Sequence, residues 1–424
     1  MSQDDINPKK KYINGPVNAI RLEGKIGSVK KVIYLFLDFH MQVEHQTQCT
    51  NIYADDFSKY LLNGFLEAKR TKRQIDFFLE IDSAMEGTTK YYTDVAGAKI
   101  RDRKMMYIRA LRHIFLKLFN YDQEKNKVFQ SQFIDNIRVH YADFRYLFDE
   151  PHSGMLLTNL EHSVSVIYEL TNSRENTVIT KLAHVVEEFR SFQDIFEECF
   201  QNDILCRTKA KLIPEIKDKE DIHNRFRYIF QKMIYKYKHS SVQKVMQDLL
   251  RIEQKKIPQI IKLLQNYSKL LINTHKKLMQ TYHHRRPPSS DINNKFDYLP
   301  YNYQTADTIK MEIPLYESLS RLEYLVNKMV GYMDIFFLRR FLDKDYITTG
   351  VVYAGAFHCG NYVRILVQKF NFKITHVSNS NGMTIPQLNT AIKKTKHPVE
   401  ANYLLVPEVL EQCADMSSFP QNFK

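Results

Sequence analysis

Residues 32–40 read Val-Ile-Tyr-Leu-Phe-Leu-Asp-Phe-His, and residues 351–358 read Val-Val-Tyr-Ala-Gly-Ala-Phe-His. Each stretch is a continuous apolar run, rich in β-branched and aromatic residues, that stops at a Phe-His pair. Runs of this length are typical of strands that are buried on both faces, as in a parallel sheet. Ligands of open α/β sheets bind beyond the carboxyl ends of the strands. We therefore predict that His40 and His358 share one cleft, although they lie far apart in the sequence.

Other segments extend the same pattern of alternating strands and helices. Further strands are expected at 75–80, 137–141 and 373–377, and helices at 55–69, 100–120, 314–343 and 360–369. The helix at 55–69 would have Asp55 or Asp56 as its N-cap, because a short acidic side chain can accept the first free backbone N–H groups. This alternation predicts an α/β fold with a mostly parallel sheet flanked by helices.

The pattern changes to continuous helical periodicity between residues 155 and 282, with one interruption near Pro258. We read the apolar stripes of this region as the core of a large all-helical insertion that covers the cleft. The predicted division of the chain is a polar arm (1–30), the first part of the α/β domain (31–150), the helical insertion (151–284), a Pro- and Ser-rich linker (285–310), the second part of the α/β domain (311–383) and a C-terminal tail (384–424).

Composition narrows the class of protein. The chain has 424 residues, of which 44% are hydrophobic, so it can bury a core and global disorder is excluded. Only 12 residues are glycine, and neither a P-loop nor the glycine fingerprint of a dinucleotide-binding fold is present. The formal net charge of +13 favours acidic partners, nucleic acid among them. The basic residues are spread along helices, however, so an ordinary solvated surface is the favoured interpretation.

The cysteines and the hydropathy pattern predict the compartment. The five cysteines are widely spaced and no pair has zinc-site spacing, so we expect reduced thiols. Cys359 adjoins His358, but side chains of adjacent residues diverge, which argues against a catalytic Cys-His pair. No stretch approaches the roughly 20 apolar residues that a membrane-spanning helix needs. The sequence therefore predicts a soluble cytoplasmic protein.

The candidate site residues are polar groups that follow the predicted strands. They are Asp38, His40 and Glu44 after the first strand, Glu80 at the end of the second, His140, Asp143 and Arg145 at the third, and His358 after the late strand. Imidazole and carboxylate groups together can act as a general base and its orienting partner, or as ligands of a divalent metal ion. The alternative for each residue alone is a purely structural role.

Four of these segments resemble the motifs of the erythromycin-esterase/ChaN/TIKI-like superfamily. Asp38-Phe39-His40 with Glu44 resembles its first motif, and the segment 76–80 resembles its second strand, which ends in Glu. The segment 137–145 resembles the third element, and 351–358 is similar to its late Gly-x-x-His strand. The chain departs from the family in one position, because Leu37-Asp38 stands where Gly-Glu usually opens the first motif.

The resemblance implies a hydrolase, because the superfamily includes hydrolases, some of them metal-dependent, and a haem-binding protein. It implies His40 or His358 as general base, with Glu80, Asp143 and Arg145 as further catalytic candidates. Asp38, His40, Glu44 and His358 would be the ligands of a divalent metal ion. The substrate would be a small molecule or an acidic protein, with the helical insertion selecting it.

A second resemblance is to uncharacterised proteins of nucleocytoplasmic large DNA viruses, through the same motifs and the high content of Lys, Asn and Ile. It implies a place in the host cytoplasm or the virion. It also leaves open an alternative function, that of a catalytically inert viral structural or host-interaction protein with a basic helical surface. Nucleic-acid binding through the Arg-rich residues 100–112 or the basic, tyrosine-containing helix at 226–238 is a third hypothesis.

Overall fold

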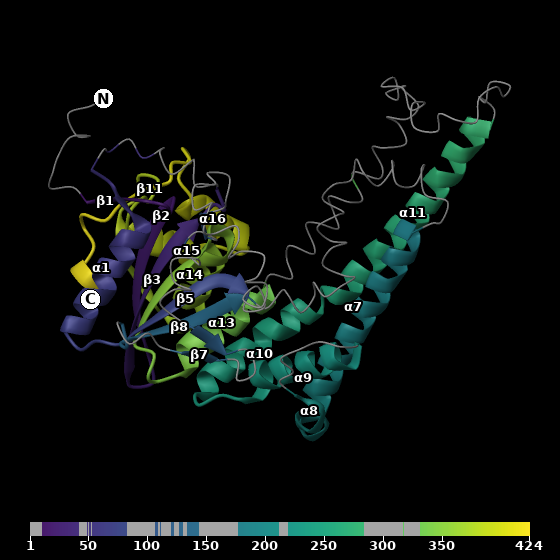
Figure 1. The fold of residues 1–424 in the computed structure, drawn as a ribbon, viewed down its shortest axis with the longest axis horizontal. Helices are drawn as coiled ribbons and strands as arrows, with labels where there is room; N and C mark the ends of the chain where they lie inside the picture. Colours follow the sequence, from purple (N-terminus) through teal and green to yellow (C-terminus); the bar gives the residue numbers. More distant parts are fainter. Residues whose placement is uncertain are drawn as a thin grey trace. The chain divides into compact units, whose positions relative to one another are not determined.

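The computed structural model describes residues 11–41, 49, 51, 53–82, 107–108, 111, 120–122, 127–129, 134–143, 177–211, 219–283, 317 and 331–424. The chain divides into two compact units (Figure 1). The first unit comprises Met1–Arg145, Tyr235–Gln247 and Met333–Lys424, and the second comprises Tyr146–Ile234 and Asp248–Tyr332.

The first unit contains a six-stranded sheet with the strand order β10-β2-β3-β9-β5-β8. Its strands are β2 (Asn18–Ile26), β3 (Val29–Asp38), β5 (Ile75–Asp82), β8 (Ile137–Asp143), β9 (Thr349–Gly355) and β10 (Lys373–Val377). The four strands β3, β9, β5 and β8 are parallel, whereas β2 is antiparallel to both of its neighbours. The predicted mostly parallel sheet is therefore confirmed, and all five predicted strands belong to it.

The amino-terminal region belongs to this sheet as well. β2 pairs with β3 along its whole length, and the two strands are joined by a tight turn in which Gly27 has a φ of +56°. The prediction of a polar arm over 1–30 is therefore wrong for the residues of β2. The polar side chains of Arg21, Glu23 and Lys25 hide an alternating strand pattern, and Arg21 is buried because it donates to the Tyr34 hydroxyl at 2.9 Å.

Helix α1 (Phe57–Arg70) covers one face of the sheet. It begins as predicted after Asp56, whose side chain accepts a hydrogen bond from the Ser58 backbone N–H at 2.8 Å. The core on this face is formed by alternate strand residues and by the buried side of the helix, among them Tyr34, Phe36, Phe57, Leu61, Phe65, Phe77 and Tyr353. A small sheet beside it joins β1 (Tyr12–Asn14), β4 (Asp55–Asp56) and β11 (Cys413–Asp415).

The C-terminal residues complete this core instead of forming a separate tail. Phe419 and Phe423 are buried against the α1 face, and the 3₁₀ turn Gln421–Phe423 lies against α1. Helices α15 (Ile385–Lys394) and α16 (Pro398–Leu405) pack beside α14 (Ala356–Phe370). Residues beyond 384 are thus an integral part of the first unit.

The opposite face of the sheet is covered by α14 and by the residues 333–343 of α13 (Gly331–Asp343). Phe337 of α13 packs edge-on against Phe78 of β5, with ring centroids 4.9 Å apart.

The end of α13 is capped by Lys31 of β3, whose buried ammonium donates to the carbonyl groups of Phe341, Lys344 and Ile347. The remaining described elements of this unit are the hairpin strands β6 (Asn120–Asp122) and β7 (Lys127–Phe129) and the residues 240–247 of α10 (Ser240–Gln254).

The described part of the second unit consists of helices. They are α7 (Thr177–Gln201), α8 (Asp203–Lys209), α9 (Lys219–Tyr235), the end of α10 and α11 (Ile257–His283), and α7 runs beside α11 (Figure 1). The break between α10 and α11 falls just before Pro258, as predicted. A large all-helical insertion over 151–284 is not confirmed, because residues 151–176 and the predicted linker at 285–310 lie outside the described residues.

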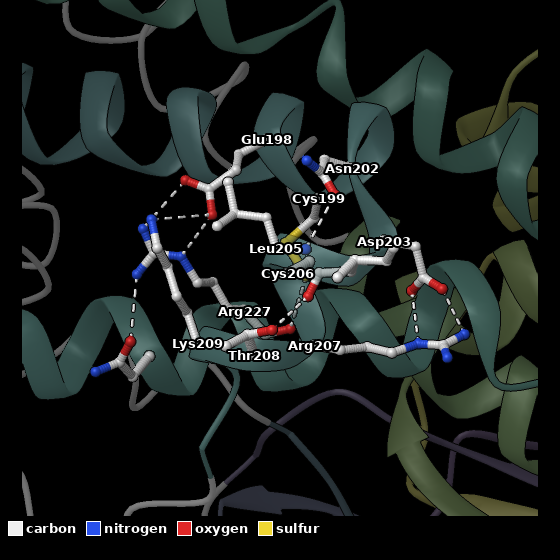
Figure 2. Close-up of a disulfide and its surroundings, with 12 residues drawn as sticks. Glu198, Cys199, Asn202, Asp203, Leu205, Cys206, Arg207, Thr208, Lys209 and Arg227 are labelled. Carbon is white, nitrogen blue, oxygen red and sulfur yellow. Dashed lines mark hydrogen bonds and ion pairs between the residues drawn. A yellow bond between two sulfur atoms is a disulfide. The ribbon is translucent and has the colours of Figure 1, made fainter.

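Two disulfides contradict the expectation of reduced thiols. Cys49–Cys413 lies in the first unit and Cys199–Cys206 in the second, whereas Cys359 is a buried free thiol. Figure 2 shows the second bridge, which joins the end of α7 to α8 across the helix break at Asn202. The prediction failed because sequence spacing does not reveal which cysteines meet in the fold. Among the helices that the structure describes, none is long and apolar enough to cross a membrane.

Candidate functional site

Three neighbouring parallel strands bring the principal candidate residues together. Asp38 at the end of β3 is the register partner of Gly355 at the end of β9, and β5, which carries Glu80, lies on the other side of β9. His40 Nε2 lies 4.0 Å from Glu80 Oε1, and His358 Nε2 lies 3.0 Å from the same oxygen atom. The two histidines, predicted to lie close together, therefore both approach Glu80, whereas an open cleft shared by them stays a prediction.

Asp38 and His40 form the first of two Asp-His pairs. Asp38 is buried, and its Oδ2 lies 2.9 Å from His40 Nδ1 while its Oδ1 accepts a hydrogen bond from the Tyr353 hydroxyl at 3.0 Å. The backbone of His40 is left-handed, with a φ of +53°, which turns the chain and lets the ring reach back to the carboxylate. Because 43% of the His40 side chain is exposed, this imidazole can meet a ligand from solvent.

Asp334 and His358 form the second pair, which is buried. His358 Nδ1 lies 2.6 Å from Asp334 Oδ1, and the other Asp334 oxygen accepts a hydrogen bond from Asn361. His358 was predicted at a solvent-facing strand end, but it lies in the first turn of α14 and is 4% exposed. The prediction failed because the strand passes directly into a helix at Gly355, which folds the next turn over the sheet.

Sequence reasoning missed Asp334, Asn361 and Tyr353. A signal for Asp334 was present, because it is an isolated acid in the otherwise apolar stretch Tyr-Met-Asp-Ile-Phe-Phe-Leu at 332–338. A carboxylate in such a stretch is seldom buried without a charged or hydrogen-bonding partner. The partner itself could not be identified, since it depends on how α13 packs against α14.

The two carboxylates around His358 make this residue a buried cation. Burial by itself lowers the pKa of His358, but the charges and hydrogen bonds of Glu80 and Asp334 outweigh burial and raise the pKa to about 10. A protonated imidazole has no lone pair with which to accept a proton. Of the two histidines that meet Glu80, His40 is therefore the better candidate for a general base.

Glu80 is held at the start of α14. Its Oε2 accepts a hydrogen bond from the Gly355 backbone N–H at 2.5 Å, and a negative charge at a helix N-terminus is favourable. A side chain at position 355 would crowd the site, because a Cβ atom there would lie 3.1 Å from His40 Nε2 and 3.2 Å from Glu80 Oε2. Glycine at this position permits the close approach of both groups.

The third predicted strand does not add to this group of residues. His140 lies within β8 and donates its Nε2 proton to Asp76 at 2.7 Å, and its ring stacks on Phe78. Burial lowers the pKa of His140 to about 4, so this ring is neutral. Asp76 precedes Glu80 by four residues, roughly 13 Å along the strand. The side chain of Asp143, and both Arg145 and Glu44, lie outside the described residues, so their predicted roles stay predictions.

Among the described residues, the donor groups do not fit the predicted divalent metal ion, and the predicted ligand Glu44 lies outside these residues. No group of three or more His, Cys, Asp or Glu residues in the described ranges is arranged to hold a metal. The reason is visible at His358, where both ring nitrogens face carboxylate oxygens and neither offers a lone pair to a cation. Of the predicted ligand set, Asp38 likewise directs its two oxygens at Tyr353 and His40.

Comparison with known proteins places the chain among viral relatives. It is 33% identical to "Uncharacterized protein R706" of Acanthamoeba polyphaga mimivirus, over 99% of this chain and 98% of the relative. It is 30% identical to "Uncharacterized protein R161" of the same virus, over 97% of this chain and 98% of the relative. No solved structure matches the chain. The predicted resemblance to uncharacterised proteins of large DNA viruses is confirmed, whereas these matches lend no support to the erythromycin-esterase/ChaN/TIKI-like resemblance.

A family model covers almost the whole chain, including both units and every site residue discussed above. The match extends over residues 11–424, and the model is described as a family of unknown function. The chain therefore belongs to the family of unknown function DUF5847.

Proposed function

We propose that the protein is a hydrolase of the erythromycin-esterase/ChaN/TIKI-like type in which His40 is the general base. One observation carries the proposal: the half-exposed His40 imidazole is held by the buried Asp38 carboxylate and faces the buried Glu80 carboxylate, near the carboxyl ends of the two strands that flank β9. A histidine oriented by an aspartate is the arrangement that general-base catalysis requires. Asp38, His40 and Glu80 are also among the residues that carry the resemblance to the superfamily.

The proposed reaction is hydrolysis of a carboxylic ester. Asp38 accepts a hydrogen bond from Nδ1–H of His40, which leaves the lone pair of Nε2 on the side of the ring that faces Glu80. Nε2 removes a proton from water while the water oxygen bonds to the carbonyl carbon, and the bond from that carbon to the leaving oxygen then breaks. Nε2 returns its proton to the leaving oxygen, so that an acid and an alcohol are released. Glu80 stabilises the imidazolium that exists between these two steps.

Assays with a panel of small carboxylic esters, from p-nitrophenyl acetate to longer acyl chains, test this proposal. We expect measurable hydrolysis by the wild type and a loss of roughly 100-fold or more in His40→Ala, the usual contribution of a general base. His397→Ala is the matched control, because His397 is exposed and its side chain makes no capping hydrogen bond. It should hydrolyse esters at the wild-type rate.

The alternative is a catalytically inert viral structural or host-interaction protein. If His40→Ala hydrolyses every ester as fast as the wild type, or if neither exceeds the rate in buffer, the hydrolase proposal is wrong and the inert alternative takes its place. Circular dichroism of both variants must match that of the wild type, so that a loss of activity reports chemistry and not unfolding.

A further inference from the structure

We infer that Asp334 and Asn361 are positioning residues, which act on His40 through the buried pair of His358 and Glu80. The inference concerns residues that neither the sequence motifs nor the proposed reaction includes. The claim that these residues affect catalysis rests on the proposed role of His40. The coupling along the network Asn361–Asp334–His358–Glu80–His40 can be measured without a substrate.

The geometry that carries the inference is a pair of Asp-His units directed at one oxygen atom. His40 and His358 each place Nδ1 against an aspartate, at 2.9 Å and 2.6 Å, and each directs Nε2 at Glu80 Oε1. The two units differ in exposure, because only His40 reaches solvent. His358 is thus a fixed buried cation between Asp334 and Glu80, and it cannot meet a ligand itself.

Asn361 extends the network by one turn of α14. Its side-chain amide donates to Asp334 Oδ2, and its Oδ1 accepts hydrogen bonds from the guanidinium of Arg364. Asn361 therefore fixes the orientation of the Asp334 carboxylate, which in turn fixes the His358 ring. Every group between Arg364 and His40 is buried, so the interactions are weakly screened by solvent.

The charge on Glu80 couples the buried pair to His40. A cationic His358 favours the ionised form of Glu80, and an ionised Glu80 favours the protonated form of His40. Among the residues that the structure describes, Asp38 is the other carboxylate in contact with His40, and Arg364 lies at the far end of the network. Burial raises the pKa of Tyr353, Tyr107 and Cys359 well above their ordinary values, so these groups stay neutral at physiological pH.

Asp334→Asn removes the charge but keeps the shape of the side chain. Without this carboxylate the His358 cation is no longer compensated by Asp334, and the more positive surroundings disfavour protonation of His40. The measurement is the rate at which diethyl pyrocarbonate modifies His40, followed by mass spectrometry of the His40 peptide as a function of pH. This reagent attacks neutral imidazole, so we expect the midpoint of the profile to move to lower pH by roughly one unit.

Asp343→Asn is the matched control. Asp343 lies on the same helix and is equally buried, but it accepts hydrogen bonds from the backbone N–H groups of Lys238 and His239, away from the site. Its His40 profile should coincide with that of the wild type. Asn361→Ala, which removes no charge, should move the profile in the same direction as Asp334→Asn by a smaller amount, and it tests the inference if Asp334→Asn does not fold.

An unchanged His40 profile in a folded Asp334→Asn protein would overturn the inference, and so would an equal shift in Asp343→Asn. These results are independent of ester hydrolysis. A shifted profile in a protein without hydrolytic activity would support the coupling and reject the proposed function. Where hydrolysis is measurable, Asp334→Asn should lower kcat and move its pH profile in parallel with the modification profile.

Discussion

Two buried histidines of the first unit have opposite pKa shifts because their surroundings differ. His358 faces two carboxylates and remains charged, whereas His140 shares one carboxylate, Asp76, with the guanidinium of Arg138. For His140 the burial of the ring is the largest influence on the pKa, and the neutral form prevails. The protonation state of a buried histidine therefore depends on the balance between burial and neighbouring charge, and the residue type alone does not determine it.

This difference predicts the pH dependence of stability at the level of single residues. The pKa of His140 falls from the ordinary 6.5 to about 4 on folding, so its contribution is fully present above pH 6.5 and is lost as the pH falls toward 4. The pKa of His358 rises to about 10, so its contribution is present below pH 6.5 and is lost as the pH rises toward 10. From these two residues alone, the unit is most stable near pH 6.5.

Urea unfolding of His140→Gln between pH 7 and pH 4 tests the acid side of this argument. The wild type should lose about 3 kcal/mol more of its free energy of unfolding over this range than the variant, since one pKa unit corresponds to 1.36 kcal/mol. His397→Gln, at an exposed position, should follow the wild-type curve. Parallel curves for the wild type and His140→Gln would show that His140 is not the neutral buried group described above.

At the level of elements, the C-terminal turn packs against α1 through one large side chain, that of Phe423. Phe423 is 1% exposed, and its ring packs edge-on against those of Tyr34 and Tyr60. It fits against Gly64 of α1 so closely that a Cβ atom at position 64 would lie 2.3 Å from the ring. This ring is the main apolar contact of the turn with α1, and Arg73 adds hydrogen bonds to the carbonyl groups of Asn422 and Phe423.

We expect Phe423→Ala to lower the free energy of unfolding by roughly 3–5 kcal/mol, the usual cost of emptying an aromatic site in a core. Val409→Ala, at a position in the same C-terminal region that is 71% exposed, should change it by less than about 0.5 kcal/mol. Denaturant unfolding of the two variants provides the comparison. Equal stability of Phe423→Ala and Val409→Ala would mean that the C-terminal turn does not belong to the core.

Elements buried on both faces could be predicted from the sequence, whereas those with polar side chains could not. β3 and β9 contain continuous apolar runs and β5 has the apolar stretch 77–79, and the residues after these runs were predicted as neighbours: Asp38, His40, Glu80 and His358. β2 was not predicted because the hydrogen-bond partners of its charged side chains lie on other segments of the chain. Arg21, for example, donates to the Tyr34 hydroxyl. Asp334 was not predicted as a site residue for the same reason, because its partners His358 and Asn361 lie on another helix.

At the scale of the whole molecule, the two disulfides constrain very different lengths of chain. Cys49 and Cys413 are separated by 364 residues in the sequence, whereas Cys199 and Cys206 are separated by 7. A disulfide stabilises a fold mainly by restricting the unfolded chain, and the restriction grows with the logarithm of the enclosed length. The Cys49–Cys413 bridge of the first unit should therefore contribute more than the local bridge between α7 and α8.

Replacement of one cysteine in each bridge tests this expectation. On the chain-entropy argument, Cys413→Ser should cost roughly 3–4 kcal/mol more in free energy of unfolding than Cys206→Ser. Urea unfolding should be followed by probes for each unit, because two units need not unfold in one step. Adding dithiothreitol to the wild type should reproduce the larger loss, and it should have little further effect on the first unit of Cys413→Ser. A larger cost for Cys206→Ser would show that the long-range bridge does not stabilise the first unit, and that the contacts of β1, β11 and the buried C-terminal aromatics hold the ends of the chain together without it.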